Sequence, residues 1–331
     1  MKNGEKATID WLLEESDPSV RFFTLTSLLG ESPAGAKAAA ARKALMREGP
    51  VADILSRQGA EGCWGKASEF YTDKYGGTVW QLLTLAELGA DGSDPRVRAA
   101  REFILVNSQD PESGGFSVNS SVKTGGGRHG EVIPCLTGNM VYSLASLGFA
   151  EDARVGRAVD WICEYQRADD GGAGPPSIWP YDRMGICFGR HSCFMGVVKS
   201  LKALAALLAG KRSRRAEAKI RELSEFLLVH RIHKRSHDPE RLSKPGWLKY
   251  GFPLMYQTDS LEILLILTRL GVRDPRMDEA VELLRSKRRS DGRWKLENSF
   301  NGKTLVDIER KGEASKWITA RALWVLDAYG A

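Results

Sequence analysis

Three residue types that bind zinc stand near the predicted starts of two buried helices. His191 and Cys193 are separated by a single residue, and Asp259 precedes the next apolar segment. Histidine, cysteine and carboxylate side chains are all zinc donors, and three protein ligands leave one position open for water or substrate. In the alternative interpretation, Asp259 caps its helix and Cys193 is a small buried hydrophobe. No CxxC or HExxH spacing favours zinc.

Basic and aromatic residues near the same helix starts could hold an anion. Lys199 and Arg321 lie inside otherwise apolar segments. A buried cation needs either a carboxylate or an anionic ligand as its partner. The sequence leaves both options open, since internal pairing with Asp182, Asp259 or Glu313 would serve equally well.

A repeat in the sequence predicts the elements that position these residues. Glycines follow six apolar helical segments at intervals of about 60 residues, and an interval of that size is typical of repeat architectures. Glycine just past a helix end is the expected cap, because it adopts the left-handed conformation cheaply. The six positions are Gly30, Gly89, Gly148, Gly210, Gly271 and Gly330.

The helices alternate between two characters. Segments that end at the glycines are almost uniformly apolar, as expected of buried helices, whereas the segments between them have one charged face. We expect inner helices near 19–29, 78–88, 135–147, 191–209, 256–270 and 315–329. Outer helices are expected near 7–15, 36–57, 95–107, 153–166, 214–230 and 275–287, and no strand is predicted.

The loops between the helices contain a recurring motif. A glutamine is followed by acidic and glycine residues and then an aromatic residue in Gln58–Trp64 and Gln109–Phe116. Related segments are Gln166–Gly172 and Asp291–Trp294, and a degenerate one ends at Trp247. This pattern resembles the QxxDGxW-type repeat of the prenyltransferase and squalene-cyclase superfamily. The resemblance implies an all-α fold, an (α/α)6 toroid of six helical hairpins, as one domain over 1–331. An open solenoid is the alternative, but the apolar last helix favours a closed ring.

The superfamily keeps its pocket at one end of the inner helices. Here the N-terminal ends of these helices follow the longest loops, and long loops without obvious structure are usually functional. We therefore expect the site at that end. The candidate catalytic residues are Asp259, His191, Cys193 and Tyr256, and the candidate substrate-binding residues are Tyr75, Thr78, Trp80, Cys135, Thr137, Asn139, Trp179, Arg190, Lys199, Trp247, Lys316 and Trp317.

The resemblance suggests two kinds of chemistry. Class II terpene cyclases protonate an alkene with a DxDD motif, which is missing here; the nearest string, 167–170, begins with arginine. Protein prenyltransferases bind zinc and a prenyl diphosphate, and they pair with a second helical subunit. We therefore expect an isoprenoid-processing enzyme, a transferase or a cyclase/lyase, that binds a prenyl diphosphate or similar amphipathic anion. The alternatives are a carbohydrate-active (α/α)6 enzyme with paired carboxylates and a non-catalytic binding toroid.

Composition excludes other classes. The chain of 331 residues has a net charge of +6, but its basic residues are spread along the sequence, so nucleic acid is not an expected partner. No apolar run is long enough to cross a bilayer. The N-terminus lacks the apolar core of a signal peptide, and the five cysteines show no paired spacing. We expect a cytoplasmic protein with a small-molecule substrate, and we leave a helical partner subunit open.

Overall fold

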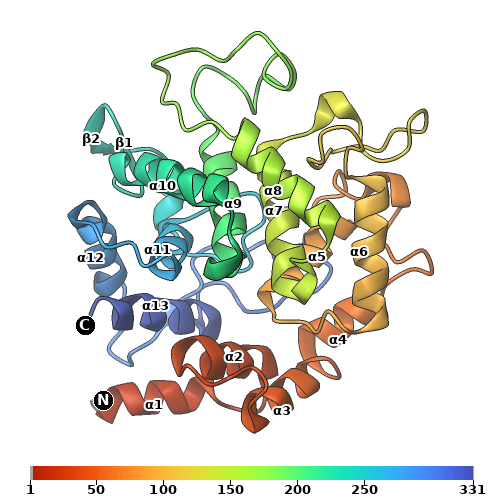
Figure 1. Ribbon diagram of the computed structural model, residues 1–331. Coiled ribbons are helices and arrows are strands. Elements are labelled where there is room, and N and C mark those ends of the chain that lie inside the picture. The colour runs from red at the N-terminus through yellow and green to blue at the C-terminus, as the bar shows by residue number, and fades with distance from the viewer. Residues whose placement is uncertain (1–2, 331) are drawn as a thin grey trace.

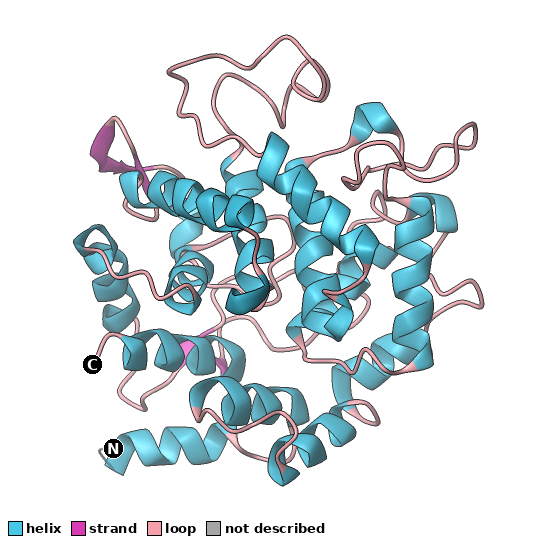
Figure 2. Cartoon of the chain, viewed as in Figure 1, coloured by secondary structure: helices cyan, strands magenta, loops and turns pink. Residues whose placement is uncertain are grey.

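The computed structural model describes residues 3–330, and these residues are mostly helical (Figure 2). Met1, Lys2 and Ala331, which the predicted domain includes, lie outside the described residues. The expected all-α character is confirmed. Two small sheets of two strands each are the exception, and neither was predicted: β1 (Lys234–Arg235) pairs with β2 (Asp238–Leu242), and β3 (Trp294–Lys295) pairs with β4 (Ala314–Ser315).

Six helices form the buried centre of the molecule, and we call them the core helices. Every residue of α5 and α7 is buried, as the uniformly apolar pattern predicts. π-Helical turns extend the first and third of the six, over Thr24–Leu28 and Ala145–Phe149. The core helices are α2 (Pro18–Phe23), α5 (Thr78–Glu87), α7 (Pro134–Leu144), α9 (Phe194–Ala206), α11 (Ser260–Arg269) and α13 (Lys316–Ala328).

The flanking helices bury one face each. In α8 the buried residues Val155, Ala158, Trp161 and Ile162 recur at helical spacing. The predicted outer helix 36–57 is in fact two helices, because Gly49 has a φ of 73° and Pro50 opens a new helical turn. The flanking helices are α1 (Asn3–Leu12), α3 (Ala36–Leu45), α4 (Gly49–Ser56), α6 (Pro95–Asn107), α8 (Ala153–Tyr165), α10 (Arg214–Val229) and α12 (Asp278–Ser286).

Most of the predicted glycine caps are confirmed. Gly30, Gly89, Gly148, Gly271 and Gly330 have φ angles between 67° and 91°. The prediction for Gly210 was wrong. Leu207 turns to an extended ψ of 144°, so α9 ends at Ala206 and Gly210 falls in a short 3-10 turn.

From α5 onward, consecutive core helices pack against one another in chain order. α5 contacts α7, α7 contacts α9, α9 contacts α11, and α11 contacts α13. α13 also contacts α2, so the last core helix meets the first (Figure 1). An ion pair of 2.8 Å between Lys316 and Glu14 joins the same two regions of the chain.

The glutamine motif ties neighbouring hairpins together. The Gln58 amide donates to the carbonyl oxygens of Gly62 and Arg96, at 2.9 Å each. Gln109 repeats this arrangement one hairpin later, with Gly114 and Arg154 as acceptors. Each glutamine thereby satisfies a carbonyl of its own loop and one in the first turn of the next flanking helix.

No helix within residues 3–330 is both long enough and apolar enough to cross a membrane.

Candidate functional site

Two of the predicted substrate-binding residues connect a motif loop to a core helix. The Thr78 hydroxyl oxygen accepts the backbone N–H of Trp64 at 3.1 Å, and the Thr137 oxygen accepts that of Phe116 at 3.0 Å. Thr319 does the same for Trp294. All three threonines are fully buried. Each fixes the aromatic residue of a motif loop to the start of a core helix, which is a structural role.

Asp259 caps α11. Its carboxylate accepts the backbone N–H of Glu262 at 2.8 Å and that of Gly251 at 2.9 Å. Burial raises the pKa of Asp259 to about 7, and the two backbone hydrogen bonds only partly oppose this shift. The helix-cap interpretation of this residue is therefore confirmed, and a catalytic role for it stays a prediction.

The structure does not assemble the predicted zinc site. His191 and Cys193 both precede α9, which begins at Phe194. The His191 side chain is 66% exposed and lies 3.8 Å from the Asp170 carboxylate, whereas Asp259 is buried at the start of α11. Within residues 3–330 no cluster of three or more histidine, cysteine or acidic side chains has metal-binding geometry.

Aromatic residues at the N-terminal ends of the core helices pack on one another. The rings of Tyr75 and Trp80 meet edge to face at 5.2 Å, and both residues are buried. Gln257 donates to the Tyr75 hydroxyl at 2.8 Å, and the Lys74 ammonium lies 4.8 Å from the Tyr256 ring. Protein atoms therefore occupy the immediate surroundings of these rings.

The other predicted residues at this end also have protein partners. Arg190 donates to the Gly171 carbonyl, Trp179 to the His129 carbonyl and Asn139 to the Met255 carbonyl. Trp247 packs on Phe194, and burial raises the pKa of the Cys135 thiol. Whether any of these residues touches a substrate stays a prediction.

A cavity of about 390 Å³ lies between the last turns of α5, α7 and α9, the side of α11 and the first half of α13. This volume is within the range usual for small-molecule sites. Residues from all six core helices and from the π-helical turns line the cavity. They include Phe22, Phe23, Glu87, Tyr142, Lys202, Glu262, Leu265, Arg269, Trp317 and Arg321. The sequence places the site at the N-terminal ends of these helices, and that location stays a prediction. Of the residues it predicts, Trp317 lines this cavity.

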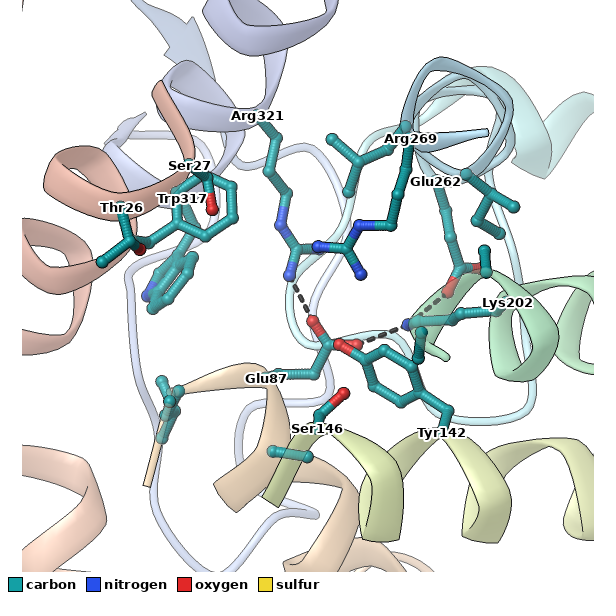
Figure 3. Close-up of a pocket in the computed structure, with 18 of the residues that line it drawn as sticks. Thr26, Ser27, Glu87, Tyr142, Ser146, Lys202, Glu262, Arg269, Trp317 and Arg321 are labelled. Atoms are coloured by element: carbon teal, nitrogen blue, oxygen red, sulfur yellow. Dashed lines mark hydrogen bonds and ion pairs between the residues drawn. The ribbon is translucent and has the colours of Figure 1, made fainter. Parts of the chain in front are cut away.

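A buried chain of alternating charges lies at the cavity, and four of its five residues line it (Figure 3). The Lys199 ammonium donates to both oxygens of Glu262, at 2.8 Å each. Lys202 bridges Glu262 and Glu87, and Arg321 donates to the second oxygen of Glu87. The five side chains come from α5, α9, α11 and α13, so the chain connects helices that are far apart in sequence.

The electrostatics of this chain keep both carboxylates ionised. Burial disfavours the charged form of Glu87, but Lys202 and Arg321 outweigh burial and lower its pKa. Lys199 and Lys202 likewise outweigh burial at Glu262 and lower its pKa. Burial lowers the pKa of Lys199, and Glu262 opposes this shift.

Two arginines have donors to spare at the cavity. In Figure 3 the side chains of Arg269 and Arg321 both point into it. Arg269 forms no ion pair or hydrogen bond with another residue of the described chain, and its guanidinium lies 5.8 Å from the Trp324 ring. The Nε of Arg321 is buried and lacks an acceptor within residues 3–330. An anion placed between these two guanidinium groups would meet unused N–H donors.

Sequence reasoning missed most of this cavity. Lys199 and Arg321 were singled out as cations inside apolar helices, and internal pairing was one of the two options for them. Glu87, Lys202 and Glu262 show the same signal, a charge within an apolar segment. Reading all five together would have predicted a charged centre.

Comparisons with known proteins find similar solved structures only at low identity. A protein from Actinoplanes is 16% identical, with 99% of each chain covered and a TM-score of 0.43. A variant of the type II terpene cyclase MstE from Scytonema, in complex with geranylgeranyl dihydroxybenzoate, is 13% identical; 85% of this chain and 94% of that chain are covered, with a TM-score of 0.33. No family model and no curated protein matches this chain.

Proposed function

We propose that the chain is an (α/α)6 toroid and an isoprenoid-processing protein that binds a prenyl diphosphate or similar amphipathic anion in the cavity between its core helices. The repeat motif and the contact between the first and last core helices support the closed ring. One observation supports the ligand class above all others: two guanidinium groups with unused donors face an aromatic-lined cavity.

The charges around the cavity favour an anion. Three buried cations, Lys199, Lys202 and Arg321, stand against two buried carboxylates, Glu87 and Glu262. A surplus of buried positive charge is costly without a partner. An anionic ligand would provide that partner, and a neutral hydrocarbon would not.

The partial negative charges of the helix C-termini oppose anion binding, but they are weaker than the charges of the cationic side chains. Core helices α5, α9 and α11 end at the cavity, and a helix C-terminus has a partial negative charge of about half an elementary charge. That partial charge acts over the last turn and is screened where water reaches it. Lys202 and Arg321 have full charges and are 6% and 5% exposed. Their attraction for an anion therefore outweighs its repulsion by the helix C-termini.

The same residues could assist the departure of a diphosphate group. Arg269 and Arg321 would stabilise the negative charge that grows on a leaving diphosphate, and the rings of Phe22, Tyr142 and Trp317 would face the cationic carbon chain. Reactions that begin by protonation need a protonated acid instead. Glu87 and Glu262 have lowered pKa values, so neither is suited to that task.

The same pKa values weigh against the carbohydrate-active alternative. A glycosidase needs one carboxylic acid with a raised pKa beside a second carboxylate. The two carboxylates that line this cavity are both held ionised by the lysines and the arginine. We therefore rank anion binding first.

Ligand-induced stabilisation tests the proposal. Ligands that bind only the folded state raise Tm by mass action. We expect farnesyl diphosphate to raise the Tm of the wild-type chain more than squalene does, and Arg321→Gln to remove most of that rise. Arg241→Gln, at an exposed pair on the β1–β2 hairpin, is the matched control and should keep the full rise. Equal stabilisation by squalene, or an unchanged response in Arg321→Gln, would contradict the proposal.

A further inference from the structure

The excess of positive charge lies in two short segments of the chain. Segments 244–249 and 285–297 together contain eight lysines and arginines and two acidic residues. Their surplus of six equals the net charge of the whole chain, which has 48 basic and 42 acidic residues, so the rest of the chain is neutral in sum. Basic residues are thus spread along the sequence, but their excess over acidic residues is not.

The fold brings these two segments together. Lys287, just after α12, donates to the Leu248 carbonyl at 2.6 Å, and its ammonium lies 4.7 Å from the Tyr250 ring. The backbone N–H of Glu297 donates to the Tyr250 carbonyl at 2.9 Å. The two segments therefore form one surface, which we call the basic surface. It adjoins α12, which lies at the edge of the molecule on the opposite side of the view from α6 (Figure 1).

The acidic residues of the basic surface are already paired. Glu297 lies 2.6 Å from the Lys287 ammonium, and Asp291 lies 3.3 Å from the Arg289 guanidinium. Arg285 pairs with Glu282 in the preceding turn. The other five cations form no ion pair within residues 3–330, and all of them except Arg293 are exposed. They are Lys244, Lys249, Arg288, Arg293 and Lys295.

Tryptophan rings support three of these five cations. The distance from the charged group to the ring is 5.9 Å for Lys244 on Trp247, 5.5 Å for Arg288 on Trp294 and 3.9 Å for Arg293 on Trp11. Such contacts hold a cation in place without neutralising its charge. The positive charge of the basic surface therefore stays available to a partner.

A hollow of about 130 Å³ lies within the basic surface. This is about four times the share of liquid volume that one water takes, and it is well below the roughly 300–1,000 Å³ of small-molecule sites. The hollow therefore admits one phosphate-sized group and not a whole small ligand. It is lined by Tyr250, Lys287, Arg289, Trp294, Lys295 and Glu297.

The side chains favour a lipid surface over other anionic partners. Single-stranded nucleic acids stack their bases on exposed rings, whereas Trp247, Tyr250 and Trp294 are 4% exposed or less. Protein interfaces centre on aromatic or apolar anchors, and the exposed large apolar residues within 3–330 all lie outside the two segments. Acidic lipid headgroups need neither feature, because clustered lysines and arginines attract them by charge alone.

We propose that the basic surface binds a lipid bilayer with acidic headgroups, and that the hollow takes a headgroup phosphate. Because the surface has no exposed apolar anchor, the protein lies on the bilayer without entering its hydrocarbon core. Such binding weakens as salt screens the charges. The inference is independent of the proposed function, since no residue of the cavity takes part in it.

Vesicle sedimentation tests the proposal. We expect the chain to sediment with vesicles of about one-third phosphatidylserine in phosphatidylcholine at about 0.1 M salt, and to stay in solution with pure phosphatidylcholine. At about 1 M salt, where the Debye length is about 3 Å, the binding should be lost. Equal binding to both kinds of vesicle, or binding to neither, would overturn the proposal.

A triple variant locates the binding surface. Lys249→Gln, Arg288→Gln and Lys295→Gln change exposed side chains that form no ion pair in the described chain, so Tm should be unchanged. Each basic residue near an acidic bilayer contributes about fivefold, so the triple variant should bind the phosphatidylserine vesicles about 100-fold more weakly. Wild-type binding by this variant would overturn the proposal.

A matched control removes the same charge elsewhere. Lys43→Gln, Arg47→Gln and Arg98→Gln change exposed residues on or next to α3 and α6. These positions lie outside the basic surface, so the control should bind the vesicles within about threefold of the wild type. Equal weakening in both variants would mean that net charge alone causes the binding, and the proposal would fail. It would also fail if the chain bound single-stranded RNA or polyglutamate in fluorescence anisotropy and did not bind the vesicles.

Discussion

The N-terminal ends of the core helices and the lining of the cavity differ in how their polar groups are used. At the N-terminal ends, Thr78, Thr137 and Asp259 accept backbone N–H groups of the loops and helix starts. At the cavity, Arg269 and Arg321 have unused donors. Polar residues of the core helices thus serve the fold in one region and remain available to a ligand in the other. Residue type alone does not distinguish the two uses.

The largest effect on stability is expected from breaking the buried chain of alternating charges at the cavity. Glu262→Leu leaves Lys199 buried without its carboxylate, and removing one partner of a buried ion pair typically costs about 3–5 kcal/mol. Urea denaturation measures the loss. Glu151→Gln, in the exposed pair with Lys211, is the control and should cost less than about 1 kcal/mol. A loss in Glu262→Leu as small as that of the control would show that the chain does not hold the helices together.

The cap of α11 should make stability depend on pH. The folded pKa of Asp259 is about 7 and its ordinary value is 3.8. The unfolded chain therefore releases this proton first, and stability falls as pH rises from about 4 to about 7, by about 1.4 kcal/mol per unit of pKa difference. Asp259→Asn should lack this contribution. Urea denaturation at pH 5 and pH 8 compares the two chains, and identical pH dependence would refute the assignment.

The threonines that accept backbone N–H groups of the motif loops should affect stability and not ligand binding. Thr137→Val keeps the shape of the side chain but leaves the buried N–H of Phe116 without an acceptor, which costs about 1–3 kcal/mol. We expect a lower free energy of unfolding and an unchanged Kd for farnesyl diphosphate. A weakened Kd at full stability would instead place Thr137 in the binding site, as the sequence predicted.

Arg269→Gln should affect ligand binding and not stability. Its side chain is exposed, and its guanidinium lies 5.8 Å from the Trp324 ring. A cation–π contact at an exposed site is worth about 0.5–1 kcal/mol, so Arg269→Gln should change stability by less than about 1 kcal/mol. The Kd for farnesyl diphosphate should rise by about tenfold, since a charge-assisted hydrogen bond is lost. An unchanged Kd would remove Arg269 from the proposed site.

The smallest effect is expected at the predicted zinc residues. His191 is exposed and Cys193 is half-buried, so the double change His191→Ala and Cys193→Ser should cost less than about 1 kcal/mol. Elemental analysis of both proteins provides the second measurement. Loss of one equivalent of zinc in the variant would restore the metal hypothesis.

The sequence by itself predicted the helical character of the chain and most of its helices. Glycine caps, apolar segments and motif loops are local patterns, and each depends on residues within a few turns of one another. They fixed the core helices to within a few residues in most cases. The break between α3 and α4 and the early end of α9 depended on single backbone angles, which no periodic pattern reports.

Only the tertiary structure decided where the cavity lies. Thr137 and Arg321 are both polar residues in apolar helices, and their residue types do not distinguish a structural role from a binding role. Their roles depend on partners more than 20 and more than 200 residues away, Phe116 for Thr137 and Glu87 for Arg321. A hydrogen bond or an ion pair requires contact in space, and spacing along one helix cannot specify which distant helix provides the other group.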